Sequence, residues 1–282
     1  MIQDPRDLFK SYGEVASLPV IYHRINMTIN NPRTSMEDIG KIIREDPGLT
    51  VRLLRLVNSA FYGFPSKIQT VTQALVLIGT RQLCDLALAT TMITIFQGIP
   101  KDLVDMESFW RHSIACGVAA KILATYRREA NIERFFVSGM IHDIGRLILY
   151  RKNGGQAREI LLQSESKGAL LVRVEQEVLG FDHATLGAML LQWWNLPSGI
   201  VEAVACHHRP HDAWLYPVEA AAVHVADLLA NALQRGSSGE RFVPPLDAKA
   251  WDVLGLSTNI LSPALDHLEQ QLDEMVHSIL GE

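Results

Sequence analysis

The sequence has 282 residues, of which 48% are hydrophobic, and this is ample for a globular core. Its 26 basic and 31 acidic residues give a formal net charge of -5 and are spread without long blocks. This balance argues against nucleic acid as the primary partner.

The sequence contains no stretch that we expect to cross a membrane. The first residues, MIQDPRDLFKSYGE, lack the basic and apolar regions of a secretory signal. The most apolar stretch, residues 74–96, is interrupted by Arg81 and Asp85.

The three cysteines indicate a reducing compartment. Cys84, Cys116 and Cys206 are odd in number, lie far apart and have apolar surroundings. This pattern fits buried free thiols better than a disulfide framework. We therefore expect a cytoplasmic protein.

Helical periodicity dominates the chain, and no sustained alternation supports a large sheet, so we predict an all-α fold. In the first part, Ser35 followed by Asp38 is a plausible cap for a helix over residues 35–44. Pro47 suits the first turn of the next helix. Further helices are predicted over residues 71–77 and 80–96. The segment NSAFYGFPSK, which follows the Pro47 helix and precedes residues 71–77, reads as a helix end followed by a loop.

The second part of the chain predicts more helices and one long loop. The expected helices cover residues 101–127, 135–150, 156–167, 169–179, 183–194, 197–207 and 216–234, followed by a last amphipathic helix that includes Leu261, Leu265, Leu268, Leu272 and Met275. Residues 135–150 are apolar nearly all round, which predicts a buried central helix. The segment QRGSSGERFVPP is predicted to be an exposed loop.

Five histidines and two aspartates form the candidate metal site. They are His112, His142, Asp143, His183, His207, His208 and Asp227. Imidazole and carboxylate groups suit zinc, iron and manganese, and an aspartate can bridge two cations. Neighbouring residues on a helix diverge by about 100°, so the two adjacent pairs would serve one centre best at a helix end or irregular turn.

Purely structural roles are the alternative to a metal site for these residues. A lone His112 would more often be a hydrogen-bonded core residue, and the whole cluster could be a scaffold without metal. The remaining histidines, His23, His211, His224, His267 and His277, are interpreted as loop, surface or core residues. Trp193 and Trp194 are expected to pack in the core. The cluster around Asn58 and Tyr62 fits either partner recognition or a capped helix end.

Several segments resemble a known superfamily. FWRHSIACGVAAKIL, GMIHDIGRLIL, GFDHATLGAMLLQWWNLPSGIVEAVACHH and VHVADLLA occur in the order found in the HD superfamily of metal-dependent phosphohydrolases. SLPVIYHRI and IIREDPGLTVRLLRLVNSAFYGFPSKIQTVTQALVLIG resemble the N-terminal portion of the HDOD family. The likeness covers nearly the whole chain and includes the specific residues Asp46, Pro47, Leu49, Asn58, Ser59 and Ala60.

The resemblance implies a fold and a division of the chain. It implies an HD-domain-like bundle of helices with an N-terminal helical subdomain. Residues 1–100 would form this subdomain and residues 101–282 the subdomain with the metal site, and together they would make one HDOD domain.

The resemblance also implies roles for the site residues. His112 would be the first ligand, His142 and Asp143 the signature couple, with Asp143 as the bridge, and Asp227 the closing ligand. The extra ligands of the related HD-GYP phosphodiesterases correspond to His183, His207 and His208. In an active enzyme the metal-bridging Asp143 would be catalytic, and Arg146 would be a candidate phosphate clamp.

Two departures bear on activity. The HD-GYP signature continues as HDIGK, whereas this sequence has Arg146 in place of the lysine. The segment HHExxDGxGYP is replaced by RPHDAWLYP after His208, so hydrolysis of cyclic-di-GMP is doubtful.

The function that the resemblance implies is bacterial signal transduction through regulatory binding, with a metal-competent HD site that holds one or two divalent ions of Fe, Mn, Zn, Ni or Mg. The alternative is an active phosphohydrolase for a nucleotide or other phosphoester, and the sequence leaves enzymatic activity undecided. The expected partner is a signalling protein or a nucleotide or phosphoester ligand. A homodimer is compatible with the sequence.

Overall fold

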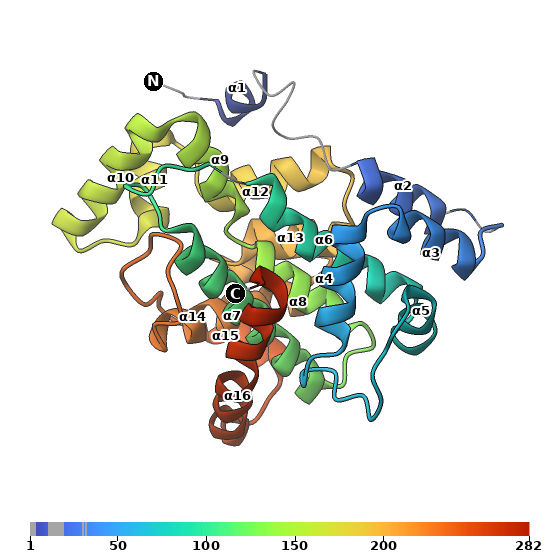
Figure 1. Ribbon diagram of the computed structural model, residues 1–282. Helices are drawn as coiled ribbons and strands as arrows, with labels where there is room; N and C mark the ends of the chain where they lie inside the picture. Colours follow the sequence, from blue (N-terminus) through green and yellow to red (C-terminus); the bar gives the residue numbers. More distant parts are fainter. Residues whose placement is uncertain (1–3, 11–19, 30, 32, 97, 282) are drawn as a thin grey trace.

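The computed structural model describes residues 4–10, 20–29, 31, 33–96 and 98–281. These residues form helices and their connections, and no β-strand occurs among them (Figure 1). The predicted all-α fold is therefore confirmed.

The first part of the chain contains six helices among the described residues. They are α1 (Pro5–Lys10), α2 (Val20–Ile29), α3 (Met36–Arg44), α4 (Pro47–Val57), α5 (Val71–Ile78) and α6 (Thr80–Ile95). The predicted cap of α3 is present, because the Ser35 side chain accepts from Asp38 N and the Asp38 side chain accepts from Ser35 N. Pro47 occupies the first turn of α4, as predicted. The sequence had not predicted α1 or α2.

The second part supplies the longest helices. They are α7 (Met106–Arg127), α8 (Ile132–Ile141), α9 (Ile144–Lys152), α10 (Gly154–Lys167), α11 (Leu171–Leu179), α12 (His183–Trp193), α13 (Ser198–Cys206), α14 (Pro217–Ala232), α15 (Ala248–Leu254) and α16 (Leu261–Leu280). Short 3₁₀ turns lie at Pro210–Asp212 and Thr258–Ile260. The sequence had not predicted α15.

The predicted single helix over residues 135–150 is wrong. The chain turns at His142 and Asp143, so that α8 ends and α9 begins there. Apolar periodicity missed the break because residues on both sides of the turn are buried. The turn directs both side chains inward.

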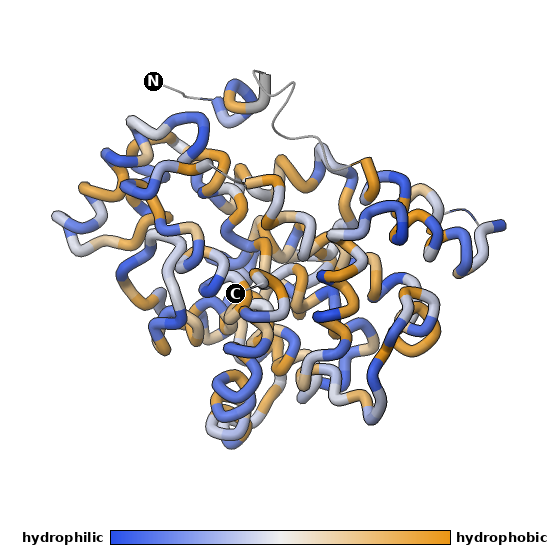
Figure 2. Tube along the Cα trace, viewed as in Figure 1, coloured by the Kyte–Doolittle hydropathy of each residue, from blue (hydrophilic) through white to orange (hydrophobic). Residues whose placement is uncertain are grey.

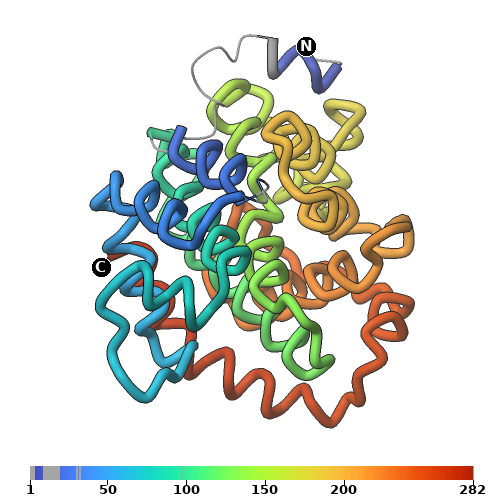
Figure 3. The backbone as a smooth tube through the Cα atoms, turned by 90° about the vertical axis from the view of Figure 1, so that its right-hand side faces the viewer, coloured from blue at the N-terminus to red at the C-terminus, as the bar shows by residue number. Residues whose placement is uncertain are grey.

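Helix α7 lies at the centre of the second half and packs against α8, α14 and α16. The last helix, α16, also packs against α4, and Figure 3 shows the C-terminal segment running back to the N-terminal half. One continuous hydrophobic core includes residues from both parts. Figure 2 shows hydrophobic and hydrophilic residues interleaved along the helices, as expected when each helix buries one face.

The segment after α4 is held by its own side chains. Asn58 Nδ2 donates to the Leu54 and Ile68 carbonyl oxygens at 2.7 and 2.8 Å, and Asn58 Oδ1 accepts from Ile68 N at 2.7 Å. The Tyr62 hydroxyl donates to Glu133 Oε2 at 2.8 Å. A capped helix end docked on α8 therefore accounts for this motif.

Two expectations about exposure are wrong. The loop after α14 is not simply exposed, because Ser238 and Glu240 are buried in it. Trp194 is buried as expected, but Trp193 is 56% exposed because it lies on the outer side of the last turn of α12.

The three cysteines are all free, as predicted. Cys84 and Cys116 are buried, whereas Cys206 is only partly buried at the end of α13.

Among the described residues, no single helix is both long and apolar enough to cross a membrane. Helices α5 and α6 together meet the criterion of length and composition, but a bend of 118° separates them.

Candidate metal centre

The structure brings all seven predicted metal-site residues together from distant parts of the chain. His112 lies on α7, His183 begins α12, and Asp227 lies on α14. The two adjacent pairs, His142 with Asp143 and His207 with His208, lie in the turns that follow α8 and α13. The prediction that adjacent pairs would lie at helix ends is confirmed.

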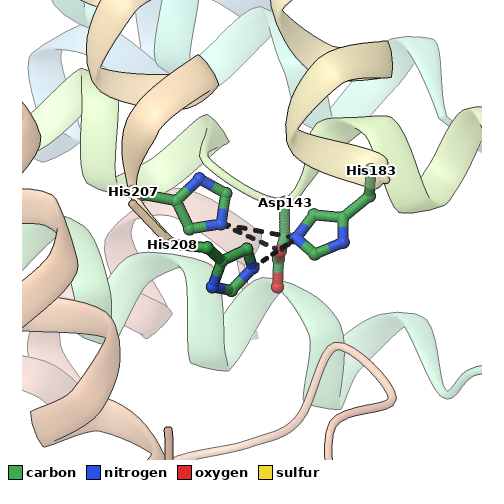
Figure 4. Close-up of side chains that lie close together, drawn as sticks. All are labelled: Asp143, His183, His207 and His208. Atoms are coloured by element: carbon green, nitrogen blue, oxygen red, sulfur yellow. Dashed lines mark hydrogen bonds and ion pairs between the residues drawn. The ribbon is translucent and has the colours of Figure 1, made fainter. Parts of the chain in front are cut away.

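One group of ligand atoms consists of Asp143, His183, His207 and His208 (Figure 4). Asp143 Oδ1 lies 2.9 Å from His183 Nε2 and 3.9 Å from His207 Nε2. His208 Nε2 lies 2.9 Å from His183 Nε2. These atoms are close enough to hold one metal ion.

A second group consists of His112, His142 and Asp143. The other carboxylate oxygen, Asp143 Oδ2, lies 3.3 Å from His142 Nε2 and 3.9 Å from His112 Nε2. Asp227 Oδ1 adjoins this group, at 3.2 Å from His112 Nε2 and 3.4 Å from His142 Nε2. Asp143 therefore presents one oxygen to each group.

His142 and His207 are positioned by the same local contact. Each is the C-terminal cap of its helix, and each Nδ1 lies 2.7 Å from the carbonyl oxygen three residues earlier, on Gly139 and Val204 respectively. In the neutral ring, a proton on Nδ1 would satisfy that carbonyl and leave the lone pair of Nε2 directed into the centre.

Three further side chains support the ligands, and sequence reasoning missed their roles. Glu175 Oε2 lies 2.5 Å from His183 Nδ1. Asn231 Nδ2 donates to Asp227 Oδ1 at 2.7 Å. His224 Nδ1 lies 2.7 Å from the His207 carbonyl oxygen. Glu175 could have been noticed as an acidic residue on the apolar face of α11, and Asn231 as a polar residue one turn after Asp227.

Arg146 is 2% exposed and lies beside the centre. Its Nε atom lies 3.4 Å from Asp143 Oδ1 and 3.8 Å from Glu175 Oε1. Its Nη1 atom donates to the Ser238 hydroxyl at 2.7 Å, and the Tyr150 hydroxyl donates to the Ser238 carbonyl oxygen at 2.8 Å. The loop after α14 therefore covers this side of the centre.

Several ligand atoms are buried without a hydrogen-bond partner. They are His112 Nδ1 and Nε2, His142 Nε2 and Asp143 Oδ1. Buried polar atoms are normally hydrogen-bonded, because leaving them without a partner is costly. Coordination of a cation would satisfy the inward-facing atoms, so this donor set fits a metal ion.

The charge states of the carboxylates suit a metal site. Burial opposes the charged form of Asp143, but Arg146, His142 and His183 outweigh it and hold its pKa well below the usual range. Burial also opposes ionisation of Asp227, but contacts with His112 and His142 hold its pKa well below the usual range. Both aspartates are therefore ionised, as metal binding requires.

The histidines differ in charge. Burial, helped by His142 and His183, lowers the pKa of His207 to about 3, so His207 is neutral. Burial and Arg146 oppose the charged form of His183, but Glu175 and Asp143 prevail and raise its pKa to about 9. Binding of a cation would therefore displace a proton from His183.

Close helix contacts fix the position of His183. A Cβ atom on Gly145 would lie 1.9 Å from the His183 carbonyl oxygen and 2.7 Å from Gly187 N. Only glycine allows α9 and α12 to approach this closely. The HDIG sequence thus supplies His142 and Asp143 to the site. Its glycine, Gly145, makes the close contact that brings His183 to them.

The match to a family model decides the identity of the fold. The HDOD domain model matches residues 15–210, which is more than half of the chain. The chain belongs to the HDOD family. A curated relative, an uncharacterized protein of Treponema pallidum, is 27% identical over 203 residues. The match covers 70% of the HDOD chain but only 38% of that relative's length.

Solved structures share the fold of this HDOD chain. An HDOD domain protein of unknown function from Geobacter sulfurreducens matches with a TM-score of 0.79 at 20% identity, covering 98% of this chain and 95% of that chain. A proposed phosphohydrolase from Shewanella amazonensis matches with a TM-score of 0.76 at 24% identity, covering 96% and 97% of the two chains. A proposed signal transduction protein from Marinobacter aquaeolei matches with a TM-score of 0.74 at 20% identity, covering 98% and 65%.

Proposed function

We propose that this HDOD chain is a bacterial signal-transduction protein that holds two divalent metal ions and acts mainly by binding a signalling partner or a phosphoester ligand. The observation that carries the proposal is the position of Asp143, whose two carboxylate oxygens face two separate groups of histidines. A carboxylate in this position can bridge two cations.

The donor set favours particular metals. His183, His207 and His208 would hold one ion with Asp143, and His112, His142 and Asp227 would hold the other with the same aspartate. Because imidazole nitrogens outnumber carboxylates, iron, zinc or nickel fits better than magnesium.

Metal analysis of purified variants tests the two-ion centre. We expect about two ions per chain in the wild type, an expectation that follows from the shared carboxylate. His208→Ala and His112→Ala should each lose one ion, and Asp143→Ala should lose both. His211→Ala is the matched control, because this exposed histidine pairs with Asp247 outside the centre. Equal metal content in all variants would refute the proposed centre.

The surroundings of Arg146 support binding as the main role. This guanidinium is enclosed by Asp143, Glu175 and Ser238. A substrate phosphate that approaches Nη1 would compete with the Ser238 contact. The centre is therefore better arranged to hold ions and shape the surface above them than to exchange substrate rapidly.

Two measurements test the signalling role. Equilibrium binding of a nucleotide panel, with and without Mn²⁺, should detect binding to the wild type that Asp143→Ala weakens. For a protein partner, bacteria that carry Asp143→Ala should show altered signalling at normal protein levels. Normal signalling in those cells would show that the centre is irrelevant to the role.

The alternative function is phosphohydrolysis of a nucleotide or other phosphoester. It is favoured by the complete set of ligands and by His208, which is only partly buried and so marks the more accessible side of the centre. When bound, two cations would supply a Lewis-acidic pair that activates water and screens charge on a phosphoryl group. Asp143 would hold the pair together, and Arg146 would contact the phosphate after leaving Ser238.

Turnover assays separate the two functions. A panel of phosphomonoesters and phosphodiesters should be assayed with Mn²⁺, Fe²⁺ or Mg²⁺ added, against Asp143→Ala as the blank. The binding function predicts no turnover above the blank. Metal-dependent turnover that Arg146→Ala reduces would instead establish the hydrolase.

A further inference from the structure

A polar cavity of about 280 Å³ lies away from the metal centre. Its walls come from α2, α6, the start of α8 and the connection between α12 and α13. The cavity thus joins residues of the N-terminal part of the chain to the two helices that precede the ligand pairs.

The cavity contains opposite charges that do not pair with each other. Arg81 and Asp85 lie one turn apart on α6 and so share a face of the helix. Asp85 is 6% exposed, whereas Arg81 is exposed. Among the described residues neither forms an ion pair within 4.0 Å. Both charged groups line the cavity, so a small molecule that carries the two opposite charges could contact both.

The wall opposite α6 adds an acceptor without a partner. Asn131, the residue before α8, has a buried Oδ1 atom that accepts no hydrogen bond. Such an acceptor is costly unless a donor reaches it. Together with the Asp85 carboxylate, it makes a place for a cationic donor such as an ammonium group.

The rest of the lining is mixed: Asn26, Arg134 and Asn195 are polar, and the other side chains are mostly apolar. Ile29, Leu196 and Ile200 contribute to the walls, beside the ring of Tyr22. The volume is slightly below the range of about 300 to 1,000 Å³ of pockets for drug-sized ligands. It therefore suits a ligand the size of an amino acid.

Two helices lead from this cavity to the metal centre. Helix α8 has Asn131 and Arg134 at the cavity and is followed by His142 and Asp143. Helix α13 has its first turn at the cavity and is followed by the His207 and His208 pair. The two helices pack against each other (Figure 1). A rise of about 1.5 Å per residue makes each helix roughly 15 Å long.

We propose that the cavity binds a free α-amino acid with an apolar side chain, whose ammonium group lies between Asp85 and Asn131 and whose carboxylate faces Arg81. Occupancy changes the affinity of the metal centre, because the ligand contacts the starts of both helices whose ends carry metal ligands. The coupling to the metal centre rests on the proposed function.

Calorimetric titration of the full chain with a panel of L-amino acids tests the binding site. We expect at least one apolar amino acid to bind, and its N-acetyl and amide derivatives, each of which lacks one charge, to fail. Arg81→Ala and Asp85→Asn should each weaken binding about tenfold or more, which equals about 1.4 kcal/mol. Arg55→Ala is the control, because this exposed arginine lies in a separate groove.

Two results would overturn the site. One is the absence of binding by every amino acid of the panel at millimolar concentration. The other is binding that Arg81→Ala and Asp85→Asn leave unchanged. Neither result depends on metal. The amino-acid test therefore remains valid even if metal analysis refutes the metal centre.

The Mn²⁺ affinity of the chain, measured with and without the bound amino acid, tests the coupling. We expect a change of about fivefold or more, and the same factor should appear in the amino-acid affinity when Mn²⁺ is added, because coupling is reciprocal. Binding of the amino acid with unchanged Mn²⁺ affinity would refute the coupling. Failure of Mn²⁺, Fe²⁺, Zn²⁺ and Ni²⁺ all to bind would refute the proposed function instead.

Discussion

Glu175 Oε2 accepts from the backbone N of His183 at 2.9 Å and lies 2.5 Å from its Nδ1 atom. One carboxylate oxygen thus fixes both the start of α12 and the orientation of its first side chain. Such a contact places the Nε2 lone pair toward the centre and makes the imidazole a stronger ligand.

We therefore expect Glu175→Gln to weaken metal binding about 10- to 100-fold, as mutations of supporting residues at metal sites commonly do. The measurement is a competition titration against a chelating dye. Glu177→Gln is the matched control, because Glu177 is exposed and pairs with Lys167. Equal losses in the two variants would contradict the positioning role of Glu175.

Gly145→Ala should disturb the centre without changing a ligand. Its Cβ atom would lie 1.9 Å from the His183 carbonyl oxygen, so α9 and α12 must move apart. We expect the free energy of unfolding to fall by about 1 to 3 kcal/mol or more, and metal content to fall with it. Urea unfolding and elemental analysis measure the two effects.

The control for this variant is Gly155→Ala in α10, where the new Cβ would meet no atom within 4 Å. It should be neutral or stabilising by about 0.5 to 1 kcal/mol, because alanine favours a helix over glycine. Similar unfolding curves for the two variants would show that the α9–α12 contact is not tight.

A buried ion pair joins α7 to α8 and should matter for stability. Lys121 Nζ lies 2.9 Å from Glu133 Oε1, and it also lies over the rings of Phe61 and Tyr62 at 3.7 and 4.0 Å. Glu133→Ala leaves the lysine buried without its partner, so we expect a loss of about 3 to 5 kcal/mol in urea unfolding.

Lys167→Ala tests the same kind of contact at the surface, where Lys167 pairs with Glu177. Its effect should stay within about 1 kcal/mol because solvent screens an exposed pair. A comparable loss in both variants would argue against a special role for the buried pair.

Asp85 predicts a pH dependence of stability. Burial is the main cause that raises its pKa to about 6 from 3.8, with Glu133 assisting, while Asn131, Arg134 and Arg81 oppose the rise. Between these two values the folded chain binds more protons at Asp85 than the unfolded chain does. The free energy of unfolding therefore falls as Asp85 ionises between about pH 4 and pH 6. Above that range the loss from this group is about 3 kcal/mol.

The Asp85→Asn variant removes this titration. Its unfolding free energy minus that of the wild type should be near zero at pH 4 and rise by about 3 kcal/mol by pH 7. Taking the difference cancels the titration of all other groups. A difference that does not change with pH would show that Asp85 is ionised normally in the folded chain.

The sequence predicted most helices, and all seven histidines and aspartates that it proposed as metal ligands lie close together in the structure. Helix caps such as Ser35 with Asp38 are local, so a short stretch of sequence suffices to recognise them. The cluster was recognisable because histidine and aspartate are the residue types that bind metals and because their order resembles that of the HD superfamily.

Other features depend on contacts between distant segments. The break at His142 was hidden because apolar residues flank it on both sides. Ser238, in a loop expected to be exposed, meets Arg146 from 92 positions away. No periodicity or spacing rule relates residues so far apart along the chain.

The sequence by itself thus determined the all-α class, the family resemblance and the identity of the clustered histidines and aspartates. Residue type and helical periodicity can both be recognised within short stretches of sequence. Only the tertiary structure decided that Asp143 faces two groups, that Glu175 orients His183, and that Arg81 and Asp85 line a cavity with Asn131. Those relationships arise from the packing of helices, which places side chains from separate elements within a few ångströms of one another.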